Sequence, residues 1–241
     1  MSSASLHRRL VQGLGRQILS GTIRPGDALP RPPGVRVSRT ALREAIKVLM
    51  SKGLVEARPR FGTRVRAREA WQLLDPDVLA WQREGPLRAA FLKNLAEVRS
   101  VIEPAAAAMA ALRATASDIT AISLAYDDMA TAVTGSKVNV GRFVAADRRF
   151  HAAILRTSGN DLLEQMAGAV FSELTAGFFV TTSLPGSARA ALPRHRRILD
   201  AIRNGRSAEA RRAMLTLVKH SARELQRLGA LTPAFSGSSQ G

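Results

Sequence analysis

Asp147 and His151 are two potential metal ligands that lie four residues apart in a segment with helical periodicity. Residues at this spacing meet on one face of a helix, and apolar positions around Phe150 border that face, so we expect the pair to point inward. Two further histidines, His195 and His220, lie in the same half of the chain. A carboxylate with imidazoles suits Zn²⁺ and neighbouring first-row ions. The spacing alone is equally typical of an ordinary helix-stabilising pair.

A second group of residues has chemistry suited to DNA. Arg39, Thr40 and Arg43 fall in the first turns of a helix for which Ser38 is a good N-cap. Arg39 and Arg43 therefore point from one face, and arginine at the start of a helix can bond the O6 and N7 atoms of guanine in the major groove. The alternative is an ordinary solvated helix face.

The elements around these arginines decide between the two interpretations. Apolar residues recur every four positions from 6 to 18, which predicts a helix, and the Ser38 helix ends at Gly53. Short strand patterns at 54–57 and 63–65 flank a basic hairpin tip that contains Arg60 and Gly62. Two helices followed by a basic hairpin are typical of a winged helix, so we expect residues 1–68 to bind DNA.

The rest of the chain lacks strand patterns. Residues 69–87 predict a linker with a short helix, which we expect to pack rather than move freely because it holds both tryptophans. Helical segments follow at roughly 88–114, 117–134, 138–158, 161–182, 187–204 and 207–228, with breaks at Gly135, Gly159 and Gly205. The predicted fold is therefore mostly α: a winged helix-turn-helix and an antiparallel bundle of six to seven helices over 88–230, with a disordered tail at 231–241.

Charge and composition narrow the function classes. The net charge is +17, of which residues 1–70 carry +11, as expected for a domain that binds a polyanion. Cysteine is absent, which excludes disulfides, thiolate metal sites and cysteine nucleophiles. No apolar stretch is long enough to span a membrane, and we expect a cytoplasmic protein without a membrane partner.

Four separated motifs resemble the N-terminal domain of the GntR family. They are Ile-Leu-Ser-Gly-Thr-Ile-Arg-Pro-Gly-Asp-Ala-Leu-Pro, Val-Ser-Arg-Thr-Ala-Leu-Arg-Glu-Ala, Gly-Leu-Val-Glu and Gly-Thr-Arg-Val, and the resemblance covers residues 6–65. It implies that the helix after Ser38 reads an operator and that Gly62 lies at the wing tip. The residues expected to contact DNA are Arg31, Arg36, Ser38, Arg39, Thr40, Arg43, Arg60, Gly62 and Thr63.

One segment departs from this family. Where the family carries the first helix of the helix-turn-helix pair, this chain has only residues 31–36, about four residues too few, with two prolines and a glycine. Either DNA binding is weakened, or Arg31 and Arg36 replace the missing contacts from an irregular loop.

The C-terminal half resembles the FCD domain of the FadR-like branch of the family. The resemblance implies that Asp147, His151, His195 and His220 hold one divalent transition metal, with zinc as the expected ion. It also implies that Arg99 points toward the effector. The alternative for Arg99 is a surface salt bridge with Glu103, four residues later.

Further similarity, in residues 74–81 and 97–105, is to the galactonate-operon repressors within this family. It implies a sugar acid, such as an aldonate, as effector. We therefore expect a non-enzymatic, homodimeric repressor that binds a palindromic operator in double-stranded DNA and is relieved by the acid.

Two other functions remain as alternatives. One is a metal-dependent enzyme that uses the Asp/His cluster, but no zinc-protease, phosphate-loop or nucleophile-elbow motif is present. The other is a basic DNA-binding protein that responds to no effector.

Overall fold

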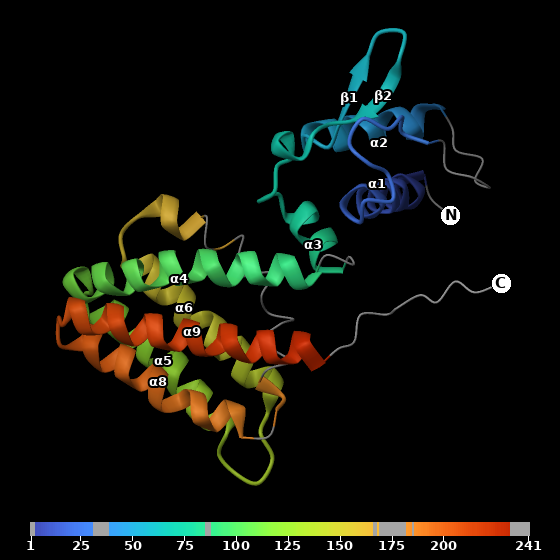
Figure 1. Cartoon of the computed structure of the whole chain (residues 1–241). Helices are drawn as coiled ribbons and strands as arrows, with labels where there is room; N and C mark the ends of the chain where they lie inside the picture. The colour runs from blue at the N-terminus through green and yellow to red at the C-terminus, as the bar shows by residue number, and fades with distance from the viewer. Residues whose placement is uncertain are drawn as a thin grey trace. The chain divides into compact units, whose positions relative to one another are not determined.

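The computed structural model describes residues 3–30, 39–84, 88–165, 168, 182–184 and 186–231. By internal contacts the chain divides into two compact units, Met1–Phe91 and Leu92–Gly241. Figure 1 shows the elements of each.

The first unit is a small helical domain with a two-stranded wing. Helix α1 (Ser3–Leu19) packs against α2 (Arg39–Ser51), and β1 (Val55–Arg58) pairs with β2 (Gly62–Val65) in an antiparallel hairpin that extends from the end of α2 (Figure 1). The periodic residues Leu10, Leu14 and Ile18 are buried against Ala45 and Leu49. The helix–helix–hairpin order predicted from the sequence is confirmed, and each strand differs from its predicted bounds by one residue.

The hairpin turns at residues with a left-handed backbone conformation. Arg58 pairs with Gly62, so residues 59–61 form the loop. Arg60 and Gly62 have φ angles of 65° and 74°, in the left-handed region where glycine carries no steric cost. Arg64 donates from Nη1 to the carbonyl oxygen of Gly26, 2.7 Å away, and this bond ties the base of the wing to the loop after α1.

The segment after the wing packs into the first unit. It contains a short 3₁₀ helix, η1 (Arg68–Ala70), and α3 (Pro76–Glu84). Trp71 and Trp81 belong to the same buried cluster as α1 and α2, and the Trp71 indole donates to the Arg66 carbonyl oxygen at 3.0 Å. The residues expected to link two domains thus contribute core side chains to the first of them.

Two close approaches fix this packing. A side chain on Gly15 would place its Cβ 2.4 Å from the Trp81 ring, so α1 and α3 can meet only because residue 15 is glycine. Lys52, at the end of α2, is 2.8 Å from Asp75 and 2.6 Å from Asp77. Burial lowers the Lys52 pKa, but its bonds to the two aspartates outweigh burial and raise it. The lysine therefore stays charged.

The second unit is a helical bundle. It comprises α4 (Arg88–Arg113), of which the first residues belong to the first unit, α5 (Ala116–Ala132), α6 (Val140–Thr157), α8 (Ser187–Arg203) and α9 (Ser207–Leu231) (Figure 1). The core includes Ile122, Met129, Phe150 and Ile198, so α5, α6 and α8 share one apolar centre. Helix α5 begins with a capping box between Thr115 and Asp118.

Most predicted helix bounds in this unit agree with the structure to within about two residues. Gly135, Gly159 and Gly205 have positive φ angles at the predicted breaks. Of the helix predicted at 161–182, residues 161–165 are helical, and most of the remainder lies outside the described residues. The tail predicted at 231–241 also lies outside them, apart from Leu231, which is the last residue of the final helix, Ser207–Leu231.

Candidate functional site

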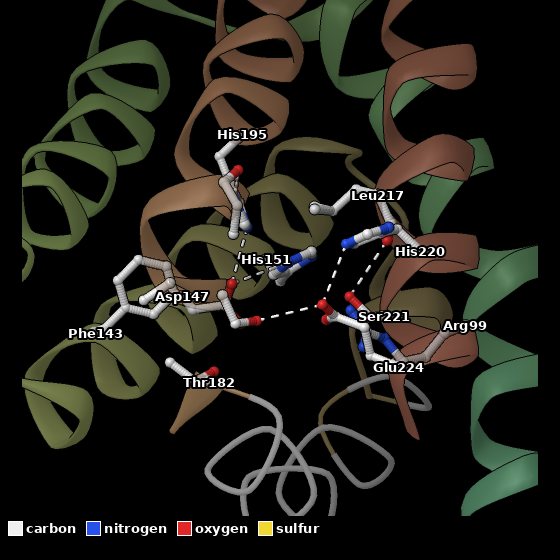
Figure 2. A pocket seen from close by; sticks show the side chains of 13 residues that line it. Arg99, Phe143, Asp147, His151, Thr182, His195, Leu217, His220, Ser221 and Glu224 are labelled. Atoms are coloured by element: carbon white, nitrogen blue, oxygen red, sulfur yellow. Dashed lines mark hydrogen bonds and ion pairs between the residues drawn. The ribbon is translucent and has the colours of Figure 1, made fainter. Parts of the chain in front are cut away.

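Three side chains converge in the interior of the helical unit. Asp147 and His151 come from α6, His195 comes from α8, and all three are buried. One ligand atom from each lies within 4.8 Å of the others. Figure 2 shows both imidazoles directed at the Asp147 carboxylate: His195 Nε2 is 2.8 Å and His151 Nε2 is 3.7 Å from Oδ1. This trio can hold one metal ion.

A backbone carbonyl fixes the orientation of the His195 ring. Its Nδ1 lies 3.0 Å from the carbonyl oxygen of Ala191, one turn earlier in α8. A carbonyl can only accept, so Nδ1 donates to it and Nε2 is the nitrogen left facing Asp147. Nε2 is buried and has no hydrogen-bond partner of good geometry. A cation between Nε2 and the carboxylate would satisfy both atoms, so these residues fit a metal.

The charge on Asp147 is maintained by its neighbours. Burial raises the pKa of this carboxyl, but the charges of the nearby His151 and His195 imidazoles outweigh burial and lower it to about 2. Asp147 is therefore ionised near neutral pH, as a metal ligand must be.

His151 has a carboxylate on its other side. Its Nδ1 is 2.6 Å from Glu103 Oε2, and Glu103 also forms an ion pair with Arg99 one turn earlier in α4. Burial raises the Glu103 pKa, but the charges of Arg99 and His151 lower it by a larger amount. Glu103 therefore stays ionised. Metal-ligating histidines characteristically direct their second nitrogen at a carboxylate or carbonyl oxygen, as His151 and His195 do here.

The Arg99–Glu103 pair predicted as the alternative for Arg99 exists, but it is buried rather than on the surface. Arg99 nevertheless lines the same cavity as the Asp/His trio.

His220 lines this cavity as well, but it lies outside the close trio. Its Nε2 is 3.3 Å from Glu224 Oε1, one turn later in α9, and Figure 2 places both across the cavity from Asp147. The structure thus brings three of the four predicted ligands together and pairs the fourth with a carboxylate.

The cavity is small. Its free volume is about 30 Å³, enough for one or two water molecules. A sugar acid is several times larger.

The DNA-reading residues predicted on α2 are at its exposed start. Arg39, Thr40 and Arg43 are all exposed. At the wing tip, Arg60 and Gly62 are exposed and Thr63 is half-buried. Arg31, Arg36 and Ser38 lie outside the described residues, so the shortened segment is not described.

Three residues beside the trio are not predicted as parts of the site by the sequence. Glu103 is predicted only as a partner of Arg99, although it also contacts His151, and the sequence gives no role to Glu224. The Phe150 ring meets the His151 and His195 rings edge-on, with centroids 5.8 and 5.2 Å away. The i,i+4 spacing of His220 and Glu224 was the one signal available.

A winged DNA-binding unit joined to a helical unit with a buried polar cavity defines a transcription regulator that responds to a small molecule. Residues 6–65 match the family model described as bacterial regulatory proteins, gntR family, and residues 94–220 match the FCD domain. The chain belongs to the GntR family and carries an FCD effector domain. It is a DNA-binding transcriptional regulator, not an enzyme.

Curated relatives support this assignment. The chain is 34% identical to the galactonate operon transcriptional repressor of Escherichia coli K12, over 91% of this chain and 96% of the relative. It is 30% identical to the HTH-type transcriptional regulator LutR of Bacillus subtilis, over 82% of this chain and 91% of that one.

Among solved structures, Lar of Listeria monocytogenes aligns with a TM-score of 0.59 at 18% identity, covering 92% of this chain and 97% of that one. A GntR protein of Streptococcus agalactiae aligns with a TM-score of 0.51 at 22% identity, covering 90% and 99%. At these identities the likeness shows the fold alone. In the described part of the chain, no helix is both long and apolar enough to cross a membrane.

Proposed function

We propose that this protein is a dimeric repressor that binds an inverted-repeat operator and is released from it by a sugar acid. The proposal that an effector controls the protein rests on one observation: Asp147, His151 and His195 converge on one buried point. Each imidazole there is oriented through its second nitrogen, by Glu103 or by the Ala191 carbonyl.

The residues that would hold a metal are Asp147, His151 and His195, with His220 as the fourth ligand. A donor set of one carboxylate and three imidazoles suits zinc. A bound divalent ion would supply positive charge that attracts the carboxylate of the effector. His220 would have to exchange Glu224 for the metal.

The proposed effector is an aldonate. One relative, 34% identical, is named for a galactonate operon, and Arg99 lines the cavity where it would pair with a carboxylate in a charge-assisted bond. Because the cavity has only about 30 Å³ of free space, the acid can enter only if the cavity widens. Effector binding would then be linked to a conformational change, as release from DNA requires.

On the DNA side, Arg39, Thr40 and Arg43 would read bases from the start of α2. The wing residues Arg60, Gly62 and Thr63 would contact the backbone and the minor groove. Arg31 and Arg36 would add contacts from the shortened segment, and Ser38 from the position just before α2. One short helix reads too few bases for useful specificity, so two copies on an inverted repeat are needed.

Calorimetric titration of galactonate into the metal-loaded protein tests the effector class. We expect binding of galactonate and at most weak binding of galactose, which has no carboxylate for the metal and Arg99. Equal affinity for the acid and the uncharged sugar would overturn the proposal.

A further inference from the structure

Helix α4 has one face made of aliphatic side chains that no described residue of its own unit covers. Val98 is 39% exposed, Val101 is 71% exposed and Leu112 is 72% exposed. The half-buried Ala105 and Ala108 lie between them on the same side. Large aliphatic side chains exposed in a row mark an interaction surface more often than a solvated one.

The spacing of these residues is that of a helix-pairing seam. Val98, Val101, Ala105, Ala108 and Leu112 are separated by three, four, three and four residues. We call these five residues the α4 apolar face. This period keeps one stripe directed at a partner helix, and the two alanines at its centre allow the helix axes to approach closely.

Charge defines the two ends of the α4 apolar face. Glu97 borders it at one end and Arg113 at the other, and in this described stretch of α4 the two charged residues between them, Arg99 and Glu103, are buried. The face is thus apolar in its middle, negative at its start and positive at its end.

We propose that the α4 apolar face pairs with the same face of a second copy of this chain, antiparallel and centred on Ala105. This inference rests on the dimer in the proposed function and assigns its interface. With a two-fold axis at Ala105, Val98 lies opposite Leu112 of the second copy, seven residues from the centre on each side. A two-fold contact must be self-complementary in this way.

The same register matches the charges. Glu97 and Arg113 are each eight residues from Ala105, so each meets the opposite charge of the other copy. A parallel pairing would place like charges together. Arg113 donates from Nη1 to the Ser158 carbonyl oxygen, and its guanidinium retains further N–H donors for a carboxylate.

Another exposed aliphatic residue of the helical unit lacks these features. Leu124 on α5 is 62% exposed, but Asp127 and Asp128 lie three and four residues after it, on the same side of the helix. Leu124 therefore serves as a matched control: similar exposure, same residue type, no apolar stripe.

Crosslinking tests the register directly, because the chain has no cysteine of its own. In Ala105→Cys the only two thiols of a dimer would face each other across the axis, close enough for a disulfide. We expect mild oxidation to convert most of this variant to a covalent dimer and to leave Leu124→Cys monomeric on a non-reducing gel. Equal crosslinking of the two variants would overturn the register.

Sedimentation equilibrium tests the face independently of the register. Leu112→Glu places two buried charges in each dimer and should raise the dimer dissociation constant about 100-fold or more, whereas Leu124→Glu should leave it unchanged. If Leu112→Glu remains as dimeric as the wild type, the interface is elsewhere and the proposed dimer stands. If the wild-type protein is itself monomeric at micromolar concentration, both the interface and the dimer are wrong.

Discussion

The His195 imidazole and the Ala191 carbonyl oxygen, one turn apart in α8, are joined by a 3.0 Å contact that turns Nε2 toward Asp147. A surface histidine gains nothing from such fixation. For a metal ligand it removes the cost of ordering the ring and selects the required tautomer.

The first prediction concerns metal content. Purified protein should carry about one transition-metal ion per chain, and His195→Ala should carry much less, because the substitution removes a ligand. Elemental analysis measures this. His7→Ala, in the DNA-binding unit, is the control. Chelation should also lower the melting temperature, since an ion that binds only the folded state stabilises it. Equal metal content in the two variants would remove the site from consideration.

The second prediction concerns Glu103. Glu103→Gln keeps the shape but loses the charge that orients the proton on His151 Nδ1, so metal affinity should fall about 10–100-fold. Competition with a chromophoric chelator measures this affinity. Nitrogen-detected histidine spectra of the metal-free variant should show His151 shifting from its Nδ1–H tautomer, a change that a purely structural role would not cause. Glu209→Gln, exposed at the start of α9, should match the wild type in both measurements.

The third prediction uses two glycines of α1 as a matched pair. A Cβ at residue 15 would lie 2.4 Å from the Trp81 ring, whereas a Cβ at residue 13 would meet nothing within 4 Å. Gly15→Ala should lower the free energy of unfolding by about 1–3 kcal/mol through overpacking. Gly13→Ala should raise it by about 0.5–1 kcal/mol through helix propensity.

Urea unfolding followed by tryptophan fluorescence measures both changes in the first unit, because the chain's two tryptophans, Trp71 and Trp81, lie there. Similar effects of the two alanines would show that α3 does not pack on α1 as described.

The fourth prediction separates base reading from backbone contact. Arg39→Ala and Arg43→Ala should each cost about 1–3 kcal/mol of discrimination between operator and altered operator. Arg60→Ala should weaken binding to all DNA alike and reduce the salt slope by about one unit. Fluorescence anisotropy at several salt concentrations distinguishes these patterns. A uniform loss in all three variants would mean that α2 does not read bases.

Local signals in the sequence predict most of the helices. The helices of the bundle follow from apolar periodicity, and their ends follow from glycines such as Gly135 and Gly205, whose left-handed backbone other residues avoid. The pairing of Asp147 with His151 follows from one helix. Their contact with His195 does not, because it depends on how α6 packs against α8, and only the family resemblance indicated it.

The parts that were missed depend on tertiary packing. Arg99 and Glu103 have the spacing of an ordinary surface pair, and nothing in that spacing indicates that both are buried beside His151. Trp81 indicated a packed linker, but its contact with Gly15 joins residues 66 positions apart.

The central claim is that an acid bound at the metal controls DNA binding. The most direct measurement is a titration of galactonate and related aldonates against a complex of the protein with its operator, first with metal present and then after chelation. A typical coupling of about 1–3 kcal/mol predicts a roughly 5–150-fold loss of operator affinity with metal and little change without it. If no aldonate alters DNA binding, or if one does so equally well after the metal is removed, the account is contradicted.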